Sequence, residues 1–207
     1  MLRIDHVVFA VRDLDEAAAR LWREHGLAAV PGGRHPAWGT GNAVVPLGED
    51  YVELLAAVDE ERARGSDLGR AILERARDGD RPFAVCLRTD DLDRVARRLG
   101  LVTVEGMRTR PDGTEIRWRS AGLDRTVEDP SLPFFIEWEV PPDLHPGRAQ
   151  ARHRARPRGI AWAVVGGDEG ALREWLGGAS LPLRAVPGPP GLAAVGIATE
   201  EGQIVLR

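Results

Sequence analysis

The sequence predicts an α+β fold built from repeated βαβββ units, and two observations predict it. First, a β-rich stretch followed by a capped amphipathic helix occurs three times, near residues 3–26, 82–100 and 159–178. Second, three short apolar segments bounded by Gly/Pro turn signals follow each occurrence, as is typical of strands. Because a repeat of this length is one supersecondary unit, we expect three related units along the chain.

The first unit has the clearest signals. Residues 3–11 are β-rich and predict a largely buried strand. Asp13 is a candidate helix N-cap with Glu16 three residues later, and Gly26 is a candidate helix stop. An apolar stripe at helical spacing lies between cap and stop. Three further strands are expected near 28–30, 42–47 and 51–57.

The second and third units repeat this pattern. The strand "PFAVCLRT" precedes a cap near Asp90 and a helix that ends at Gly100, and further strands are expected near 102–108, 114–119 and 133–140. The strand "GIAWAVV" precedes the cap Asp168 and a helix that ends at Gly177. Strands near 182–186, 192–198 and 203–206 complete the third unit.

These patterns divide the chain into five segments. Residues 1–58, 82–140 and 159–207 are the three βαβββ units, of which the third is degenerate. Residues 59–81 form a helical connector, with a helix over 67–77 capped by Ser66. Residues 141–158 are rich in proline and arginine and are expected to form a solvated linker.

The composition narrows the class of function. With 43% hydrophobic and 29% charged residues, the 207-residue chain is typical of a soluble globular protein. A formal net charge of -4 offers no general attraction for nucleic acid, and no apolar run is long enough to span a bilayer. The single cysteine, Cys86, cannot form an internal disulfide, so we expect a cytoplasmic protein.

The stretches "IDHVVFAVRDLDEAAARL", "GGRHPAWGTGN" and "DYVELLAAV" resemble the vicinal oxygen chelate superfamily, in particular its glyoxalase-like domains. The resemblance implies that two units pair into a cup-shaped, half-open barrel of eight strands around a divalent metal. A third unit is unusual for a fold that pairs its units. We expect it to cover the side of the barrel or to pair with a second copy in a homodimer.

The resemblance also implies a set of metal ligands. His6 occupies the ligand position on the first strand and Glu53 the one on the last strand. Matching "YVELL" to "FIEWE" adds Glu137, whereas matching the two Asp-Leu-Asp sequences places Ala84 at the second histidine position. The expected set is therefore His6, Glu53 and Glu137, which suits Zn²⁺, Mn²⁺, Ni²⁺ or Fe²⁺. The missing fourth ligand leaves a metal-free site as the alternative.

Substrate-binding candidates come from the loop expected over 31–42, which contributes His35, Trp38 and Asn42. Strand alternation places Arg88 on the face of His6, where a guanidinium grips an acidic group, although a strand-end arginine also reaches water. Phe135 is a candidate for the cleft wall. Cys86 shares the cavity face, where a buried cysteine is most often packing.

These residues favour two functions. One is a metal-assisted lyase or isomerase that acts on a small oxygenated metabolite, in which Glu53 or Glu137 moves a proton α to a carbonyl. The other is a metal-free protein that sequesters a small molecule, as resistance members of the superfamily do. A ring-cleaving dioxygenase is less favoured, because its iron site needs two histidines and a carboxylate.

Overall fold

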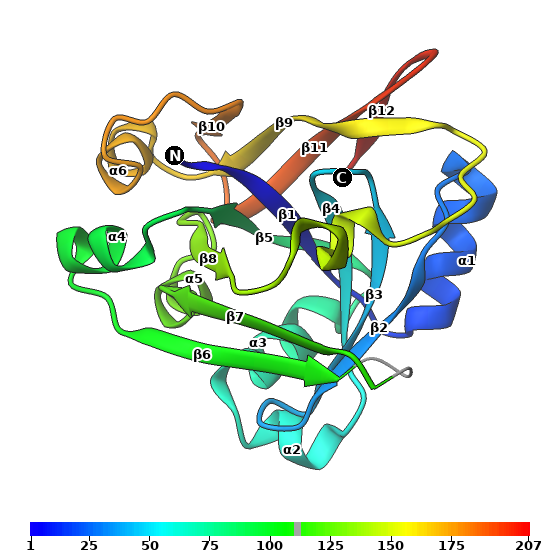
Figure 1. The fold of residues 1–207 in the computed structure, drawn as a ribbon, viewed down its shortest axis with the longest axis horizontal. Helices are drawn as coiled ribbons and strands as arrows, with labels where there is room; N and C mark the ends of the chain where they lie inside the picture. Colours follow the sequence, from blue (N-terminus) through cyan, green and yellow to red (C-terminus); the bar gives the residue numbers. More distant parts are fainter. Residues whose placement is uncertain (110–112) are drawn as a thin grey trace.

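The computed structural model describes residues 1–109 and 113–207, and it confirms the α+β fold. Eight strands form one sheet in the order β2-β3-β4-β1-β5-β8-β7-β6, which curls into a nearly closed barrel (Figure 1). Four further strands form a second sheet in the order β10-β9-β11-β12. Six α-helices lie in the described part of the chain.

The first unit supplies one half of the barrel. It comprises β1 (Arg3–Ala10), α1 (Leu14–His25), β2 (Val30–His35), β3 (Thr40–Pro46) and β4 (Tyr51–Ala57). The Asp13 carboxylate caps α1 by accepting a hydrogen bond from the Glu16 N–H. Gly26 ends the helix in the left-handed region at φ 66°, where glycine has no Cβ to clash. Both predicted helix signals of this unit are therefore confirmed.

The second unit supplies the other half with the same strand order. It comprises β5 (Arg81–Arg88), α4 (Leu92–Leu99), β6 (Thr103–Thr109), β7 (Glu115–Ala121), α5 (Leu123–Glu128) and β8 (Phe134–Trp138). The connector forms α2 (Glu60–Arg64) and α3 (Asp67–Ala76), the latter capped by Ser66 as predicted. The first strands of the two units, β1 and β5, pair antiparallel at the centre of the sheet, and each pairs parallel with the last strand of its own unit.

The third unit has the predicted order of elements but a different order of strands. It comprises β9 (Pro157–Gly166), α6 (Glu169–Trp175), β10 (Leu183–Val186), β11 (Gly191–Thr199) and β12 (Gly202–Leu206). Its first strand pairs with the second and third strands of the unit rather than with the last. The third unit therefore differs from the other two in its strand order as well as in its sequence.

Two expectations about connecting segments are wrong. Residues 31–35 belong to strand β2 instead of a loop, because they pair with β3. The segment 141–158 is not a simple solvated linker: it forms the short 3-10 helices η1 (Pro142–Leu144) and η2 (Pro146–Arg148) and buries His145. The proline and arginine content of the segment predicted that it would be exposed. His145 is nevertheless buried, because its side chain packs against the barrel and contacts Asp5.

The barrel sheet has two apolar faces. The outer face carries Val7, Val52 and Val85, which pack against α1 and the second sheet in one cluster. The inner face carries Val8, Leu55 and Ile136 in a separate cluster. Strand alternation produces this division, since successive side chains point to opposite sides of a sheet. The second sheet thus covers the side of the barrel, one of the two arrangements expected from the sequence (Figure 1).

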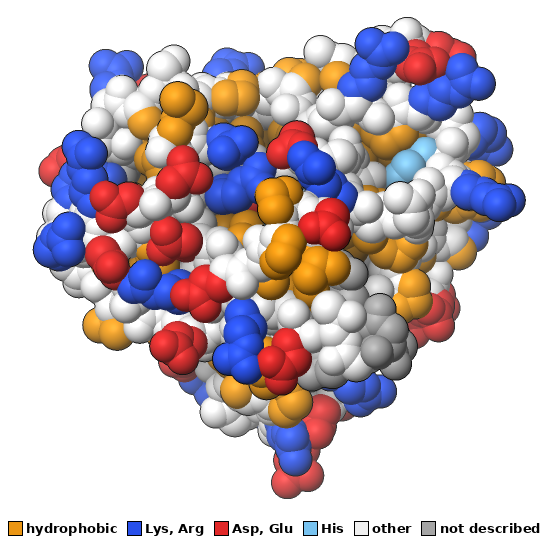
Figure 2. Space-filling model, viewed as in Figure 1, with side chains coloured by type: hydrophobic (Ala, Val, Ile, Leu, Met, Phe, Trp, Pro, Cys, Tyr) orange, Lys and Arg blue, Asp and Glu red, His pale blue; other side chains and the backbone are white. Residues whose placement is uncertain are grey.

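The face of the molecule drawn in Figure 2 shows no strong bias toward one charge. Acidic and basic side chains are largely interspersed on the face drawn in Figure 2. None of the helices in the described part of the chain combines the length and the apolar character that crossing a bilayer requires. The homodimer and the cytoplasmic location stay predictions.

Asp50 joins the second sheet to the barrel. It lies in the turn between β3 and β4, and its carboxylate oxygens accept the Ile160 N–H of β9 at 3.1 and 3.0 Å. Burial raises the pKa of Asp50 to about 6, although the hydrogen bond from Ile160 opposes the rise. The folded chain therefore binds this proton more tightly than the unfolded chain, whose value is near 3.8.

We predict that Asp50→Asn stabilises the protein increasingly as the pH rises from 4 to 7. A raised folded-state pKa contributes stability below the unfolded value, and that contribution is lost as the pH rises through 6. The amide avoids the loss and still accepts the Ile160 N–H. The gain should reach ~2–3 kcal/mol at pH 7, measured by urea unfolding at each pH. The exposed Asp143→Asn is the control, and equal pH profiles for the wild type and Asp50→Asn would contradict the prediction.

Candidate functional site

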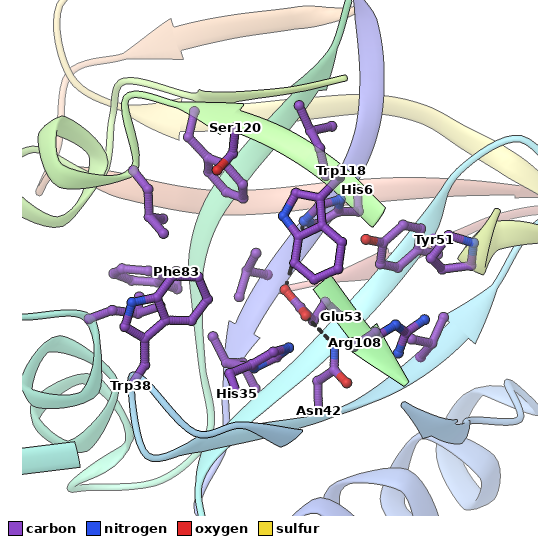
Figure 3. A pocket seen from close by; sticks show the side chains of 18 of the residues that line it. His6, His35, Trp38, Asn42, Tyr51, Glu53, Phe83, Arg108, Trp118 and Ser120 are labelled. Atoms are coloured by element: carbon purple, nitrogen blue, oxygen red, sulfur yellow. Dashed lines mark hydrogen bonds and ion pairs between the residues drawn. The ribbon is translucent and has the colours of Figure 1, made fainter. Parts of the chain in front are cut away.

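A cavity opens inside the barrel, between its two halves (Figure 3). It holds about 720 Å³, including the open mouth. The walls are mostly aromatic and aliphatic, and the polar side chains gather near β1 and β4. The lining comprises His6, Val8, His35, Trp38, Asn42, Val44, Tyr51, Glu53, Leu55, Leu68, Phe83, Arg108, Trp118, Ser120, Leu123, Phe134, Ile136, Trp138 and Pro146.

His6 reaches the cavity from β1 beside a break in strand pairing. Ile4 pairs with Leu87 and His6 with Cys86, so Asp5 is an extra residue in β1. Such a bulge re-aims side chains that would otherwise point to opposite faces. As a result, the Asp5 carboxylate lies 2.7 Å from Nδ1 of the neighbouring His6 ring.

Asp5 is fully buried and is the centre of a polar cluster. Its Oδ1 contacts His6 Nδ1, and its Oδ2 lies 3.0 Å from both Trp138 Nε1 and His145 Nε2. The Arg88 Nε is 3.5 Å from the same oxygen. Burial by itself raises the pKa of Asp5, but the hydrogen bonds from His145 and His6 outweigh it and hold the pKa well below its usual range.

The hydrogen-bond partners decide the tautomer of His145 and orient the ring of His6. His145 Nδ1 accepts the Gly147 N–H at 3.1 Å, so its proton is on Nε2 and is donated to Asp5. An ionised Asp5 can only accept, so His6 donates from Nδ1. The other ring nitrogen of His6, Nε2, faces Glu53 Oε2 across 3.7 Å.

Glu53 is held from the other side by Asn42. Asn42 Oδ1 accepts the Gly33 N–H at 2.6 Å, which directs its amide nitrogen to Glu53 Oε1 at 2.5 Å. The other Glu53 oxygen is the one that faces His6 (Figure 3). The Glu53 side chain lines the cavity and is 12% exposed, so its carboxylate can contact a molecule bound there.

Three titratable side chains near His6 and Glu53, those of Tyr51, Cys86 and His35, stay in their neutral forms at neutral pH. Burial, with added repulsion from Asp5 and Glu53, raises the pKa values of the Tyr51 hydroxyl and the Cys86 thiol well above their usual ranges. Burial lowers the pKa of His35, which contacts the Thr40 hydroxyl at 3.1 Å. Tyr51 also stacks on the His6 ring with centroids 4.4 Å apart.

Five of the predicted site residues share this cavity, and two on β8 do not. His6, His35, Trp38, Asn42 and Glu53 all line the cavity. The expectation that Glu137 and Phe135 would join them is wrong. Glu137 forms an ion pair with Arg119 at 3.3 Å, and Phe135 is fully buried against Trp175 in the outer cluster.

The error for Glu137 is a shift of one residue. On β4 the residues Tyr51 and Glu53 face the cavity, whereas on β8 the cavity side carries Phe134 and Ile136. The alignment of Glu53 with Glu137 is shifted by one residue relative to the structure. Because successive side chains of a strand point to opposite faces, this shift places Glu137 on the wrong face. Ile136 therefore stands where the second carboxylate was expected.

Arg88 is also absent from the cavity lining. Its guanidinium contacts Asp5, donates to the Glu49 carbonyl at 3.1 Å and lies 3.7 Å from the Glu49 carboxylate. Alternation placed it on the correct face of β5. Its position at the end of the strand, however, brings it to the buried Asp5 rather than to a ligand.

The donor set does not fit a divalent metal ion. Of the expected ligands, only His6 and Glu53 meet. Among the described residues, the one group of three acidic, histidine or cysteine ligand atoms within 4.8 Å is Asp5, His6 and Cys86. Both Asp5 oxygens already accept hydrogen bonds, and burial keeps the Cys86 thiol protonated. A metal site needs three or more available donors that meet, and of the expected set only His6 and Glu53 do so.

The sequence held signals for residues that the prediction missed. Asp5 is an acidic residue within an apolar strand, next to a histidine. Because burying an unpaired charge is costly, such a residue indicates that polar partners surround it. Trp138 directly follows Glu137 in the sequence and lines the cavity. No local pattern identified His145, because its contact with Asp5 spans 140 positions.

We predict that His145→Phe changes the hydrogen bonding of His6 without touching it. The phenyl ring keeps the volume but removes the donor to Asp5, so the free energy of unfolding should fall by about 1.5–3 kcal/mol. ¹⁵N spectra of the imidazoles should show a shift of the His6 Nδ1 signal, because this nitrogen donates to the same Asp5 carboxylate. The control His153→Phe, in the same segment, removes the acceptor of the Ala28 N–H. It should leave the His6 signals unchanged, and identical His6 signals in both variants would contradict the role of His145.

Comparisons with known proteins agree with this architecture. The family described as a glyoxalase-like domain matches residues 4–179. A hypothetical protein from Staphylococcus aureus is similar in structure, with 18% identity and a TM-score of 0.67 over 99% of this chain and 84% of that chain. A comparison with curated proteins found no match.

Two methylmalonyl-CoA epimerases are more distant structural neighbours. The enzyme from Mycobacterium tuberculosis is 24% identical with a TM-score of 0.47, covering 69% of this chain and 90% of its own. The enzyme from Streptomyces coelicolor, in complex with 2-nitronate-propionyl-CoA, is 18% identical with a TM-score of 0.46, covering 66% and 95%. Because the family match spans well over half of the sequence, the chain belongs to the glyoxalase-like domain family.

Proposed function

We propose that this protein binds a small oxygenated molecule in the barrel cavity and moves a proton on the carbon next to its carbonyl group. One observation carries the proposal. The buried Asp5 orients His6 so that its Nε2 faces the Glu53 carboxylate at 3.7 Å, at the polar end of an otherwise apolar cavity. A positioned carboxylate beside an oriented imidazole is the arrangement that general acid–base catalysis requires.

The walls of the cavity support a small-molecule ligand. They are mostly apolar with a few polar groups, as is typical of small-molecule sites. Trp38, Phe83 and Trp118 line the cavity with flat aromatic surface. A ligand would therefore bury an apolar body against these rings and turn its oxygenated group toward β1 and β4.

The proposed step moves one proton. The C–H bond α to the carbonyl breaks, its proton passes to the Glu53 carboxylate, and its electron pair forms a C=C bond as the carbonyl becomes an enolate. Tyr51, whose raised pKa keeps its hydroxyl protonated, and Arg108 line the same cavity and can donate to the enolate oxygen. Return of the proton to the other face or another carbon gives an isomerase, and loss of a β-substituent gives a lyase.

Sequestration without turnover is the second candidate. The second unit contributes aromatic and aliphatic walls rather than a carboxylate, with Phe134, Ile136 and Trp138 in the positions that face the cavity. A site with one polar pole and broad apolar walls binds tightly through burial alone. In that case His6 and Glu53 would orient the ligand and move no proton.

We predict that the protein accelerates exchange of the α-protons of 2-indanone, a flat ketone used here as the probe, with D₂O. Exchange is followed by ¹H NMR, and binding by saturation-transfer signals in the same tube. Glu53→Gln should lower the protein-dependent exchange rate at least about 100-fold, because general-base catalysis contributes about that much or more.

The matched control is Glu137→Gln, the same change at the acid that faces away from the cavity. It should exchange the probe as fast as the wild type. Binding with no exchange in any protein would favour sequestration. Absence of binding at millimolar probe, or exchange that survives Glu53→Gln, would overturn the catalytic proposal.

We also predict that Zn²⁺, Mn²⁺ and Ni²⁺ produce no stabilisation that depends on Glu53. Two available protein donors are too few to hold these ions tightly at micromolar concentration. Thermal unfolding is measured with each ion for the wild type and for Glu53→Ala. A rise of several degrees in the wild type that disappears in the variant would show that a metal site does form.

A further inference from the structure

We propose that the molecule whose oxygenated end binds in the barrel cavity carries an uncharged aliphatic tail, which leaves the cavity along a surface groove beside β6. This inference rests on the proposed function and names the class of its ligand, a carbonyl compound with an apolar tail. It comes from a groove that shares part of its wall with the cavity, and from the side chains that the groove exposes.

The groove is continuous with the cavity. It lies between the beginning of α3, the beginning of α5 and the segment 102–104 at the start of β6. The side chains that line both spaces form the neck between them, and they are Trp38, Leu68, Ser120 and Leu123. Because three of these four are large and apolar, an apolar tail can pass from one space into the other without meeting a charge.

The groove leaves the cavity on the side away from Arg108. Figure 3 shows Trp38 and Ser120 to the left of Glu53, whereas Arg108 lies to its right. Arg108 lines the cavity but not the groove. A ligand whose carbonyl end lies beside Glu53 would therefore enter the groove with the end that points away from this basic side chain.

The outer part of the groove exposes apolar side chains to water. Val102 is 78% exposed and Val104 is 54% exposed, and both line the groove together with Val127. Contiguous exposed apolar surface marks a site at which a ligand or another protein binds. Since this surface continues from the neck, the tail of a ligand held in the cavity would cover it.

The described residues that line the groove carry negative charge and no positive charge. The acids are Asp67 and Asp124, and the Arg70 that pairs with Asp67 lies outside the lining. Helix α3 begins here, and its N-terminus would favour an anion. The Ser66 hydroxyl already accepts the Gly69 N–H, however, and the Asp67 carboxylate lies in the same first turn. A tail that ends in a carboxylate or phosphate would thus lie beside acids, whereas an uncharged tail meets no repulsion.

A second copy of the chain is the competing occupant of this surface. The strand β6 is an edge of the barrel sheet, and Met107 on its other face is also exposed. A contact between copies, however, has no need of a neck that opens into the cavity. The shared wall therefore favours a ligand tail, and the oligomeric state becomes one outcome of the test.

The test uses methyl ketones that share one head and differ in tail length: 2-butanone, 2-hexanone, 2-octanone and 2-decanone. NMR titration of the ¹⁵N-labelled full chain gives the dissociation constants and the backbone amides that respond. We expect the dissociation constant to fall by about two- to fourfold for each CH₂ that enters the groove, because burial of apolar surface favours binding. The amides of residues 102–104 should shift with 2-decanone and not with 2-butanone.

Val104→Asn should reduce the gain from tail length. The variant places an amide in the groove wall, and this amide must lose water when the tail covers it. The ratio of the 2-butanone to the 2-decanone dissociation constant should fall at least about fivefold relative to the wild type. Val205→Asn is the matched control, the same change at an exposed valine of β12, and it should keep the wild-type ratio.

The compound 9-oxodecanoate tests the charge of the tail. It has the same ketone head and the same number of carbon atoms as 2-decanone but ends in a carboxylate. We expect it to bind more weakly than 2-decanone, because no basic side chain among the described groove residues replaces the water around the carboxylate. Equal or tighter binding would overturn the uncharged tail.

The outcomes separate this inference from the proposed function. Binding of 2-butanone with no gain along the series, or a gain that Val104→Asn leaves unchanged, overturns the tail while the cavity proposal stands. A wild-type dimer that Val104→Asn converts to a monomer in sedimentation would assign the surface to a second copy and also overturn the inference. Absence of binding by every ketone at millimolar concentration overturns both.

Discussion

The buried carboxylate of Asp5 is the interaction on which the site depends. An ionised group inside a protein is tolerated only when donors surround it, and Asp5 has His6, His145 and Trp138. These donors come from β1, the 141–158 segment and β8. One charge therefore holds together both halves of the barrel and the connection to the second sheet, and the orientation of His6 follows from it.

The two halves of the barrel share a topology but divide the chemistry. The first unit supplies His6, Glu53 and Asn42, whereas the second supplies mainly the apolar walls and Arg108. Duplication of a unit requires only that its apolar pattern be kept, since burial of both sheet faces stabilises the fold. Polar groups inside the cavity are not needed for this burial, so the second unit can lack them, and most of the polar groups of the cavity then come from the first unit.

The roles of the site residues stay predictions, but the sequence indicated which side chains reach the cavity where the residue and its strand face could be read locally. His6 and Glu53 stand in clear strands of the first unit, and both reach the cavity. Glu137 failed because the register between the two units had to be guessed, and an error of one residue reverses the face of a strand. Arg88 failed for another reason: its face was right, but a buried acid that the prediction overlooked lies within its reach.

The sequence by itself determined the repeated units, the helix caps and the apolar strands, because these depend on residues within a few positions of one another. Only the tertiary structure decided which polar groups meet. The bulge at Asp5, the contact of His145 with that carboxylate and the separate topology of the second sheet all join residues distant in the chain. Such contacts depend on packing and on the satisfaction of a buried charge, which no local pattern encodes.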